Sequence, residues 1–205
     1  MSNGAKENML AKIRQALTSP APEPFPDTDM HAPLYTGAGD DLAVTFAENF
    51  IRLQGQFSYC ADLDDLRSQL KMLMERKEWH RVYCANEGLK RLLQMDWYDE
   101  LASCNAAITG CEALVARTGS IVLSAAQAKG RTASVYAPAH ICVAYSSQLL
   151  PDVSHALDWM HRKYKGQLPS MISFANGPSR TADIEKTLVT GVHGPREVFC
   201  FLVEG

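Results

Sequence analysis

Three short segments in the second half of the sequence combine residue types that could bind a small anion. The middle segment, Asn176–Glu185, places the fork-shaped cation Arg180 between the hydroxyls of Ser179 and Thr181, a set that suits a carboxylate or phosphate. It follows a predicted strand and is expected to begin a helix, whose first N–H groups and dipole attract anions. The alternative is that Ser179 or Thr181 only caps that helix. The predicted anion-binding residues here are Gly177, Ser179, Arg180, Thr181 and Asp183.

The third segment, Gly191–Arg196, holds His193 between two glycines just before the last predicted strand. A histidine titrates near neutral pH, so in a loop it can exchange a proton or contact an anion. A lone histidine is more often a turn or packing residue, and that alternative stays open. Its closeness in sequence to Arg180 favours function, so His193 is a catalytic candidate and Gly194 an anion-binding candidate.

The first segment runs from Thr109 through Ala113 and continues at Arg117–Leu123. Here Thr118 and Ser120 flank Gly119, which would let the backbone approach a ligand closely. A simple turn between core elements is the alternative. Glu112 is the second catalytic candidate, because an acyl-CoA transferase needs a nucleophilic carboxylate, for which Asp183 and Glu185 also qualify.

Several kinds of site lack support in the sequence. The six cysteines form no C-x-x-C pair, and no histidine lies at zinc-finger spacing, so no bound metal or cluster is predicted. There is no G-x-G-x-x-G or Walker A motif, so no motif supports nucleotide binding. The G-x-S-x-G motif of the nucleophile elbow in α/β-hydrolases is also absent. No cofactor is therefore evident.

The bulk properties narrow the class of protein further. The chain has 205 residues and a formal net charge of -3, which argues against nucleic acid as a partner. No window approaches about 18 consecutive apolar residues, so no membrane span is expected. The first residues lack the apolar core of a secretory signal, and a cytoplasmic location is expected.

The elements that must position these segments form two regions. Residues 8–17 have an apolar stripe and predict a short helix, and Thr18–Gly39 contains five prolines and predicts an extended arm. We therefore divide the chain into an N-terminal helix and arm, 1–39, and a main domain, 40–205. The apolar helix must dock on its own domain, on a second copy or on a partner, so a homo-oligomer formed through the arm is one possibility.

The main domain has the alternating pattern of an α/β fold. Helices are predicted from Asp40 to about Gln54, after Asp62, over Leu89–Leu93 and after Pro151–Asp152. Asp40 can cap the first of these helices, and Asp62 and Asp152 open the helices that follow them. Strands are predicted at Phe57–Cys60, Arg81–Cys84, Ala106–Thr109, Ile121–Ser124, His140–Ala144, Met171–Phe174 and Val198–Val203. This order predicts a three-layer α/β domain with one mixed, mostly parallel sheet.

In this order, the three segments resemble those of the LUD-domain family, in particular its lactate utilisation protein C group. The strongest stretch is Gly177–Glu185 with Gly191–Pro195 behind it, and Thr109–Gly110 with Thr118–Ser120 resembles the other hallmark. Arg131, Pro138, His140 and Ile141 fit the stretch between. The resemblance covers roughly the last hundred residues, whereas the first hundred match only in layout.

The resemblance implies a fold similar to the NagB/RpiA/CoA-transferase group. It implies a subunit without a cluster that helps oxidise L-lactate to pyruvate beside iron–sulfur partner proteins, with a small carboxylate metabolite as ligand. Members often have an acidic residue where Arg117 stands, which puts a carried-over mechanism in doubt. Two other functions stay open: a binding or scaffold protein without chemistry, and a stand-alone enzyme resembling a CoA transferase or sugar-phosphate isomerase.

Overall fold

The computed structural model describes residues 3–18, 37, 39, 41–129, 131–184 and 187–205. The chain forms two units, Met1–Thr36 and Gly37–Gly205. In the first unit, helix α1 (Asn3–Leu17) confirms the predicted N-terminal helix and begins earlier than expected. The proline-rich arm lies almost entirely outside the described residues. None of the described helices is both long and apolar enough to cross a membrane.

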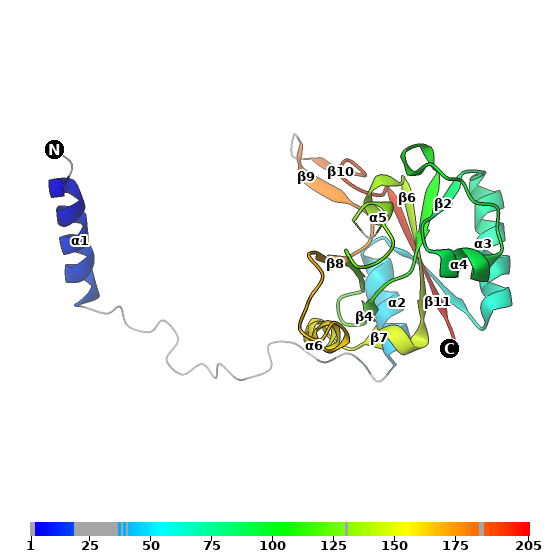
Figure 1. Ribbon diagram of the computed structural model, residues 1–205, viewed down its shortest axis with the longest axis horizontal. Coiled ribbons are helices and arrows are strands. Elements are labelled where there is room, and N and C mark those ends of the chain that lie inside the picture. The colour runs from blue at the N-terminus through cyan, green and yellow to red at the C-terminus, as the bar shows by residue number, and fades with distance from the viewer. Residues whose placement is uncertain (1–2, 19–36, 38, 40, 130, 185–186) are drawn as a thin grey trace. The chain divides into compact units, whose positions relative to one another are not determined.

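A parallel sheet forms the centre of the second unit (Figure 1). In the described part of the chain its five strands lie in the order β1-β11-β6-β3-β2, and every neighbouring pair is parallel. β11 and β6 lie between other strands of the sheet, which explains their largely apolar sequences. The strands are β1 (Gln56–Cys60), β2 (Val82–Cys84), β3 (Ala106–Thr109), β6 (Ala139–Tyr145) and β11 (Glu197–Val203).

A second sheet lies beside the first, so the prediction of one mixed sheet is wrong. Its described strands have the order β7-β4-β5-β8. A tight turn at Thr118–Gly119 folds β4 back onto β5, and this antiparallel hairpin builds a sheet of its own, which β8 extends. The strands are β4 (Ala113–Val115), β5 (Ser120–Ser124), β7 (Leu149–Leu150) and β8 (Ile172–Ala175).

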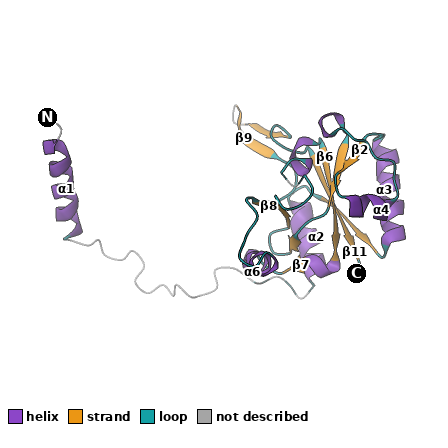
Figure 2. Ribbon diagram, viewed as in Figure 1, coloured by secondary structure: helices purple, strands orange, loops and turns teal. Residues whose placement is uncertain are grey.

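Helices and sheets stack in layers around two main clusters of buried side chains (Figures 1 and 2). Helices α3 (Leu63–Lys77) and α4 (Glu87–Leu93) cover one face of the parallel sheet. The other face packs against helix α2 (Leu42–Arg52) and the second sheet. Helix α6 (Val153–Lys163) covers the outer face of the second sheet through Ala156. The order of layers explains why both faces of β5 are buried.

Side-chain caps set the start of the main helices. The Asp62 carboxylate accepts hydrogen bonds from the Asp64 and Asp65 N–H groups, and Asp152 accepts one from Val153, as predicted. Asp41 caps α2, whereas the predicted cap Asp40 lies outside the described residues. The remaining short helices are α5 (Ala133–Tyr136), η1 (Leu101–Ser103) and η2 (Ser146–Gln148).

The helix predicted to begin near Ser179 is replaced by a β-hairpin. Strands β9 (Arg180–Ile184) and β10 (Thr187–Thr190) pair antiparallel. β-branched residues such as Thr181, Val189 and Thr190 lose rotamer freedom in a helix and fit a pleated strand better. The prediction that Arg180 lies at a helix start is therefore wrong, and no helix dipole supports an anion there.

Candidate anion-binding site

The first and second predicted segments are in direct contact. Ile121 of β5 pairs with Ala175 of β8, which brings the following Asn176 beside Ser120. The amide nitrogen Nδ2 of Asn176 donates to the Thr118 carbonyl at 2.9 Å and to Ser120 Oγ at 2.8 Å. The Thr118 and Ser120 hydroxyls are 2.6 Å apart and share a hydrogen bond. Both hydroxyls are therefore already engaged in hydrogen bonds within the protein.

The second and third segments also meet. The Ser179 N–H donates to the Pro195 carbonyl, and the Gly191 N–H donates to the Ser179 carbonyl, both at 2.9 Å. A Cβ added at Gly194 would lie 2.9 Å from Ser179 Cβ, so glycine permits this close packing. We call Ser179–Thr181 together with Gly191–Pro195 the hairpin–loop junction. The junction lies at the amino ends of β6 and β11, where the Arg196 N–H donates to the Pro138 carbonyl.

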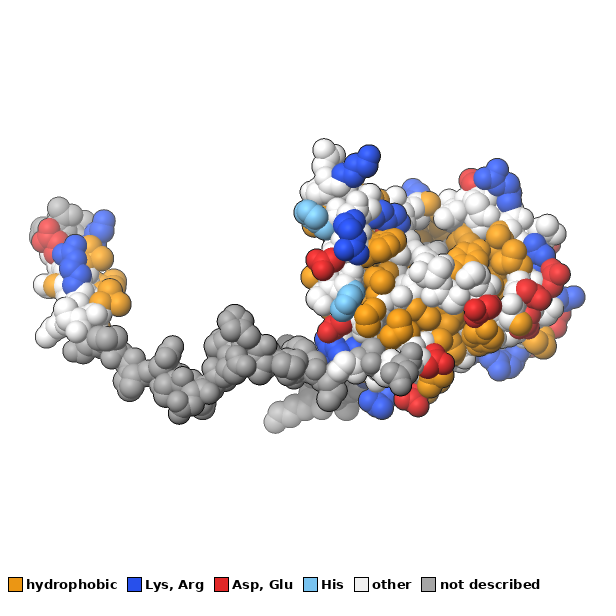
Figure 3. Space-filling view, turned by 90° about the horizontal axis from the view of Figure 1, so that it is seen from below, with side chains coloured by type: hydrophobic (Ala, Val, Ile, Leu, Met, Phe, Trp, Pro, Cys, Tyr) orange, Lys and Arg blue, Asp and Glu red, His pale blue; other side chains and the backbone are white. Residues whose placement is uncertain are grey.

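The hairpin–loop junction has a buried side and a side exposed to solvent. Pro195 is buried, Ser179 and Thr181 are half-buried, and Arg180 and His193 are exposed. Figure 3, which views the main unit from the α6 side, shows histidine, basic and acidic side chains at the end where α6 lies. A guanidinium, an imidazole and a hydroxyl are groups that can bond a carboxylate. Arg180 and Thr181 are consecutive residues of β9, so their side chains point to opposite faces of the strand.

Two of the predicted glycines pack on helix α2. Gly119 has a φ of +58°, and a Cβ there would lie 2.6 Å from the Phe50 nitrogen. Gly177 has a φ of +75°, and a Cβ there would lie 2.4 Å from the Leu53 carbonyl oxygen. Both positions need glycine for conformation and for space. In the structure, these two glycines place the segments on α2.

Glu112 lies at the opposite end of β4 from the Thr118–Gly119 turn. Its carboxylate is only 2% exposed and accepts hydrogen bonds from Ser124 Oγ at 2.5 Å, Lys163 Nζ at 2.7 Å and Tyr164 Oη at 2.8 Å. Burial alone would raise the pKa of Glu112, but the bonds from Lys163, Ser124 and Tyr164 outweigh it, and the pKa is lowered. These contacts favour a structural role and set Glu112 apart from the junction.

Arg117 pairs with the cap of helix α6. Its Nη2 lies 2.7 Å from Asp152 Oδ1, and this bond is the main reason why the pKa of Asp152 is lowered. The guanidinium thereby links the β4–β5 turn to the start of α6. It is a positioning contact between two layers.

Sequence reasoning missed the two amides that connect the segments. Asn176 was part of the middle segment but was not among the predicted site residues, and Asn49 of α2 donates to the Ala116 and Arg117 carbonyls, both at 3.0 Å. The only signal in the sequence was the Asn-Gly-Pro turn at 176–178. The Asp183 side chain and Glu185 lie outside what the structure describes.

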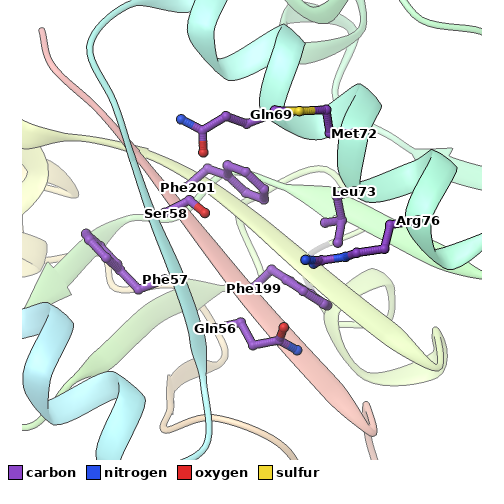
Figure 4. A pocket seen from close by; sticks show the side chains of 9 residues that line it. All are labelled: Gln56, Phe57, Ser58, Gln69, Met72, Leu73, Arg76, Phe199 and Phe201. Carbon is purple, nitrogen blue, oxygen red and sulfur yellow. The ribbon is translucent and has the colours of Figure 1, made fainter.

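Another cleft on the main unit lies away from these segments. It runs between α3 and the edge strand β1, where Gln69, Met72 and Arg76 face Phe199 and Phe201 (Figure 4). None of the predicted site residues lines it. Within the described ranges, no group of three or more His, Cys, Asp or Glu residues could hold a metal ion.

Comparisons with known proteins agree on one family. Residues 38–203 match the model of the LUD domain. A lactate utilization protein C of Geobacillus sp. is 34% identical over 57% of this chain and 56% of that protein, and one of Bacillus subtilis is 32% identical over 57% of both. An uncharacterized protein of Neisseria meningitidis serogroup B is 24% identical over 95% of this chain and 91% of that protein. The chain spans about half the length of the lactate utilization proteins that it matches.

One solved structure shares the fold. A DUF162 family protein from Deinococcus radiodurans superimposes with a TM-score of 0.61 and 20% identity, covering 79% of this chain and 96% of that one. This likeness supports the α/β architecture with its parallel sheet and its second, mixed sheet.

Proposed function

The chain belongs to the LUD domain family, and from that premise we propose that it acts in lactate utilisation by binding a small carboxylate at the hairpin–loop junction. The observation that carries the proposal is the backbone pairing of Ser179 with Pro195 and Gly191. It brings the two strongest family segments together around exposed Arg180 and His193.

Each group at the junction has a chemical task in this proposal. Arg180 makes a charge-assisted pair with the carboxylate of a 2-hydroxy acid such as L-lactate. The Ser179 hydroxyl bonds a carboxylate oxygen, and His193 contacts the 2-hydroxyl, where it can accept or return a proton. Similarity to proteins named lactate utilization protein C supports the choice of lactate.

We further propose that oxidation of lactate takes place in an assembly with iron–sulfur partner proteins. In that arrangement this chain supplies the ligand site, and the partner proteins carry the clusters that accept electrons. The proposal rests on the family resemblance, because the hairpin–loop junction itself only accounts for binding.

The test is a titration of the full chain with L-lactate, followed by amide signals in a two-dimensional nitrogen–proton NMR spectrum. We expect saturable shifts at Arg180, Thr181, His193 and Gly194. Arg180→Ala removes a charge-assisted bond of about 1.5–3 kcal/mol and should weaken binding about tenfold or more. Arg162→Ala, which removes an exposed arginine of α6, is the matched control.

A cellular test follows the same logic. A strain that lacks the gene should lose growth on lactate, and the Arg162→Ala gene should restore growth whereas the Arg180→Ala gene should not. Lactate binding that is unchanged in Arg180→Ala would contradict the site. Normal growth of the deletion strain on lactate would contradict the function.

A further inference from the structure

The outer edge of β1 pairs with no strand in the described part of the chain. Alternate residues of a strand bond a parallel neighbour. The Cys60 carbonyl accepts from the Glu204 N–H, so Cys60 and every second residue before it bond β11. The backbone N–H and C=O groups of Phe57 and Tyr59 therefore face the open edge. The Tyr59 carbonyl accepts one bond there, from Gln69 Nε2 at 2.9 Å, and its second lone pair can accept another.

β1 lacks the features that usually protect an exposed edge strand. Natural sheets block such edges with charged side chains, proline, bulges or a covering segment. The sequence Gln-Phe-Ser-Tyr-Cys contains no charge and no proline, and its register with β11 is regular throughout. The opposite edge strand, β2, has only three residues, and the Tyr98 N–H donates to the Val82 carbonyl there. Of the two edges of the parallel sheet, β1 is therefore the one open to another strand.

The side chains of β1 are complementary to a second copy of the same strand. When two β1 strands pair antiparallel about a twofold axis at Ser58, Phe57 of each copy lies opposite Tyr59 of the other. Each such pair can exchange an N–H···O bond in both directions. Phe57 and Tyr59 lie on the same face of the sheet, and Tyr59 is 49% exposed. Aromatic pairs across antiparallel strands stabilise the pairing.

Helix α3 carries opposite charges beside the two ends of β1. Arg76 is exposed and lines the same cleft as Gln56, at the amino end of β1 (Figure 4). Asp65 lies at the carboxyl end, where its Oδ2 accepts a bond from the Ala61 N–H at 3.0 Å. Within the described ranges, neither Arg76 nor Asp65 takes part in an ion pair. An antiparallel second copy would bring its acidic end to Arg76 and its basic end to Asp65.

Between these two charges, α3 presents neutral side chains to the cleft. Gln69 and Met72 line it, and Met72 is 60% exposed. These residues and the two charged ones follow the spacing of a single helix face. A twofold axis that places Asp65 opposite Arg76 also places Gln69 opposite Met72, so this helix face is complementary to its own copy. We call the combined surface the β1–α3 edge: Phe57, Tyr59, Asp65, Gln69, Met72 and Arg76.

We propose that two copies of this chain associate through the β1–α3 edge, with their β1 strands antiparallel, so that the two parallel sheets form one continuous sheet. Pairs of Asp65 with Arg76 across the twofold axis set the register, because a shift along the strands would separate them. None of the residues of the β1–α3 edge belongs to the hairpin–loop junction. The proposal therefore does not depend on lactate binding.

The test is sedimentation velocity of the full chain over a series of concentrations, where we expect a dimer. Arg76→Glu sets acidic groups against each other across the axis, and Asp65→Lys sets basic groups against each other. Each substitution should weaken the dimer at least about tenfold. An equal mixture of the two variants should restore it, because every charged pair of the mixed dimer is again of opposite sign. Lys71→Glu, at an exposed residue of α3 that lines a different cleft, is the matched control.

Amide hydrogen exchange tests whether β1 itself forms the contact. The Phe57 and Tyr59 amides should exchange more slowly in the unmodified dimer than in Arg76→Glu. Ile13→Asp, on the exposed stripe of α1, should change neither the dimer nor this protection. Four results would overturn the proposal: a monomer at every concentration, single charge variants that dimerise like the unmodified chain, a mixture no more dimeric than its components, or a dimer lost in Ile13→Asp and kept in Arg76→Glu.

Discussion

The Asn176 side chain donates to the buried hydroxyl of Ser120 at 2.8 Å, and this bond joins the second predicted segment to the first. Asn176 also donates to the Thr118 carbonyl at 2.9 Å. One amide therefore fixes the β4–β5 turn against the chain that leads to the hairpin–loop junction.

The energetic coupling between Asn176 and Ser120 can be measured. Asn176→Ala leaves the Thr118 carbonyl and Ser120 hydroxyl without this donor and should lower the free energy of unfolding by about 1–3 kcal/mol. A double-mutant cycle with Ser120→Ala in urea unfolding should give a coupling energy of about 0.5–2 kcal/mol. Strict additivity of the two single substitutions would contradict the coupling.

Gly119→Ala should destabilise the main unit strongly. The new Cβ would lie 2.6 Å from the Phe50 nitrogen, and the φ of +58° is itself unfavourable for alanine. We expect a loss of at least about 2 kcal/mol in the free energy of unfolding, measured by urea denaturation. Gly110→Ala serves as the control, since its Cβ meets nothing closer than 3.9 Å. Equal stability of the two variants would show that α2 does not pack on Gly119 as described.

Lys163→Met should destabilise the protein in a pH-dependent way. It removes the cation from Glu112, which is 2% exposed, while Lys163 itself is 44% exposed. Because Lys163 is partly solvated, we expect a loss of about 1–3 kcal/mol at pH 7, below that of a fully buried pair. Lys165→Met, on an exposed neighbour, is the control.

The sign of the pH effect follows from the lowered pKa of Glu112. A carboxylate whose pKa is lower in the folded chain stabilises the fold above its ordinary pKa of 4.5, and the effect is lost as the pH falls through the folded value. The difference in stability between Lys163→Met and the unmodified chain should therefore shrink on acidification below about pH 4.5. A difference that grows in acid would contradict the ion pair.

His140 should make the fold sensitive to acid over a different range. Its pKa falls from 6.5 to about 4 on burial, so between these values the unfolded chain binds a proton that the folded chain does not. Stability should fall as the pH drops from 6.5 towards 4, by up to about 3 kcal/mol from this residue. His140→Gln should flatten that part of the profile, and exposed His80→Gln should leave it unchanged. Urea unfolding from pH 4 to 7.5 measures both.

Much of the fold follows from local patterns in the sequence. Asp62 and Asp152 cap the helices they were expected to cap, because an aspartate before an apolar stripe acts through its own neighbouring N–H groups. The apolar run Val198–Val203 lies in a central strand, where both faces are covered. These features depend on few distant contacts.

The wrong predictions concern features that depend on contacts between residues far apart in the sequence. The segment after Ser179 has the acidic residues of a helix start, Asp183 and Glu185, yet β10 pairs with it and makes it a strand. The second sheet depends on how β4 folds back onto β5, which residue types alone do not reveal. Likewise, Glu112 meets Lys163 and Tyr164 only because α6 packs on the second sheet. The order of the three segments along the chain pointed to the family, whereas the supporting side-chain amides of Asn49 and Asn176 were not predicted.

The β9–β10 hairpin stands on the backbone bonds of Ser179 to Pro195 and Gly191, at the edge of the layers. Its length can therefore vary without repacking either sheet. Relatives with the same layered interior could diverge in ligand range by altering this one appendage. Exchanging this hairpin between family members is thus the simplest way to change which ligands the protein binds while keeping its layered interior.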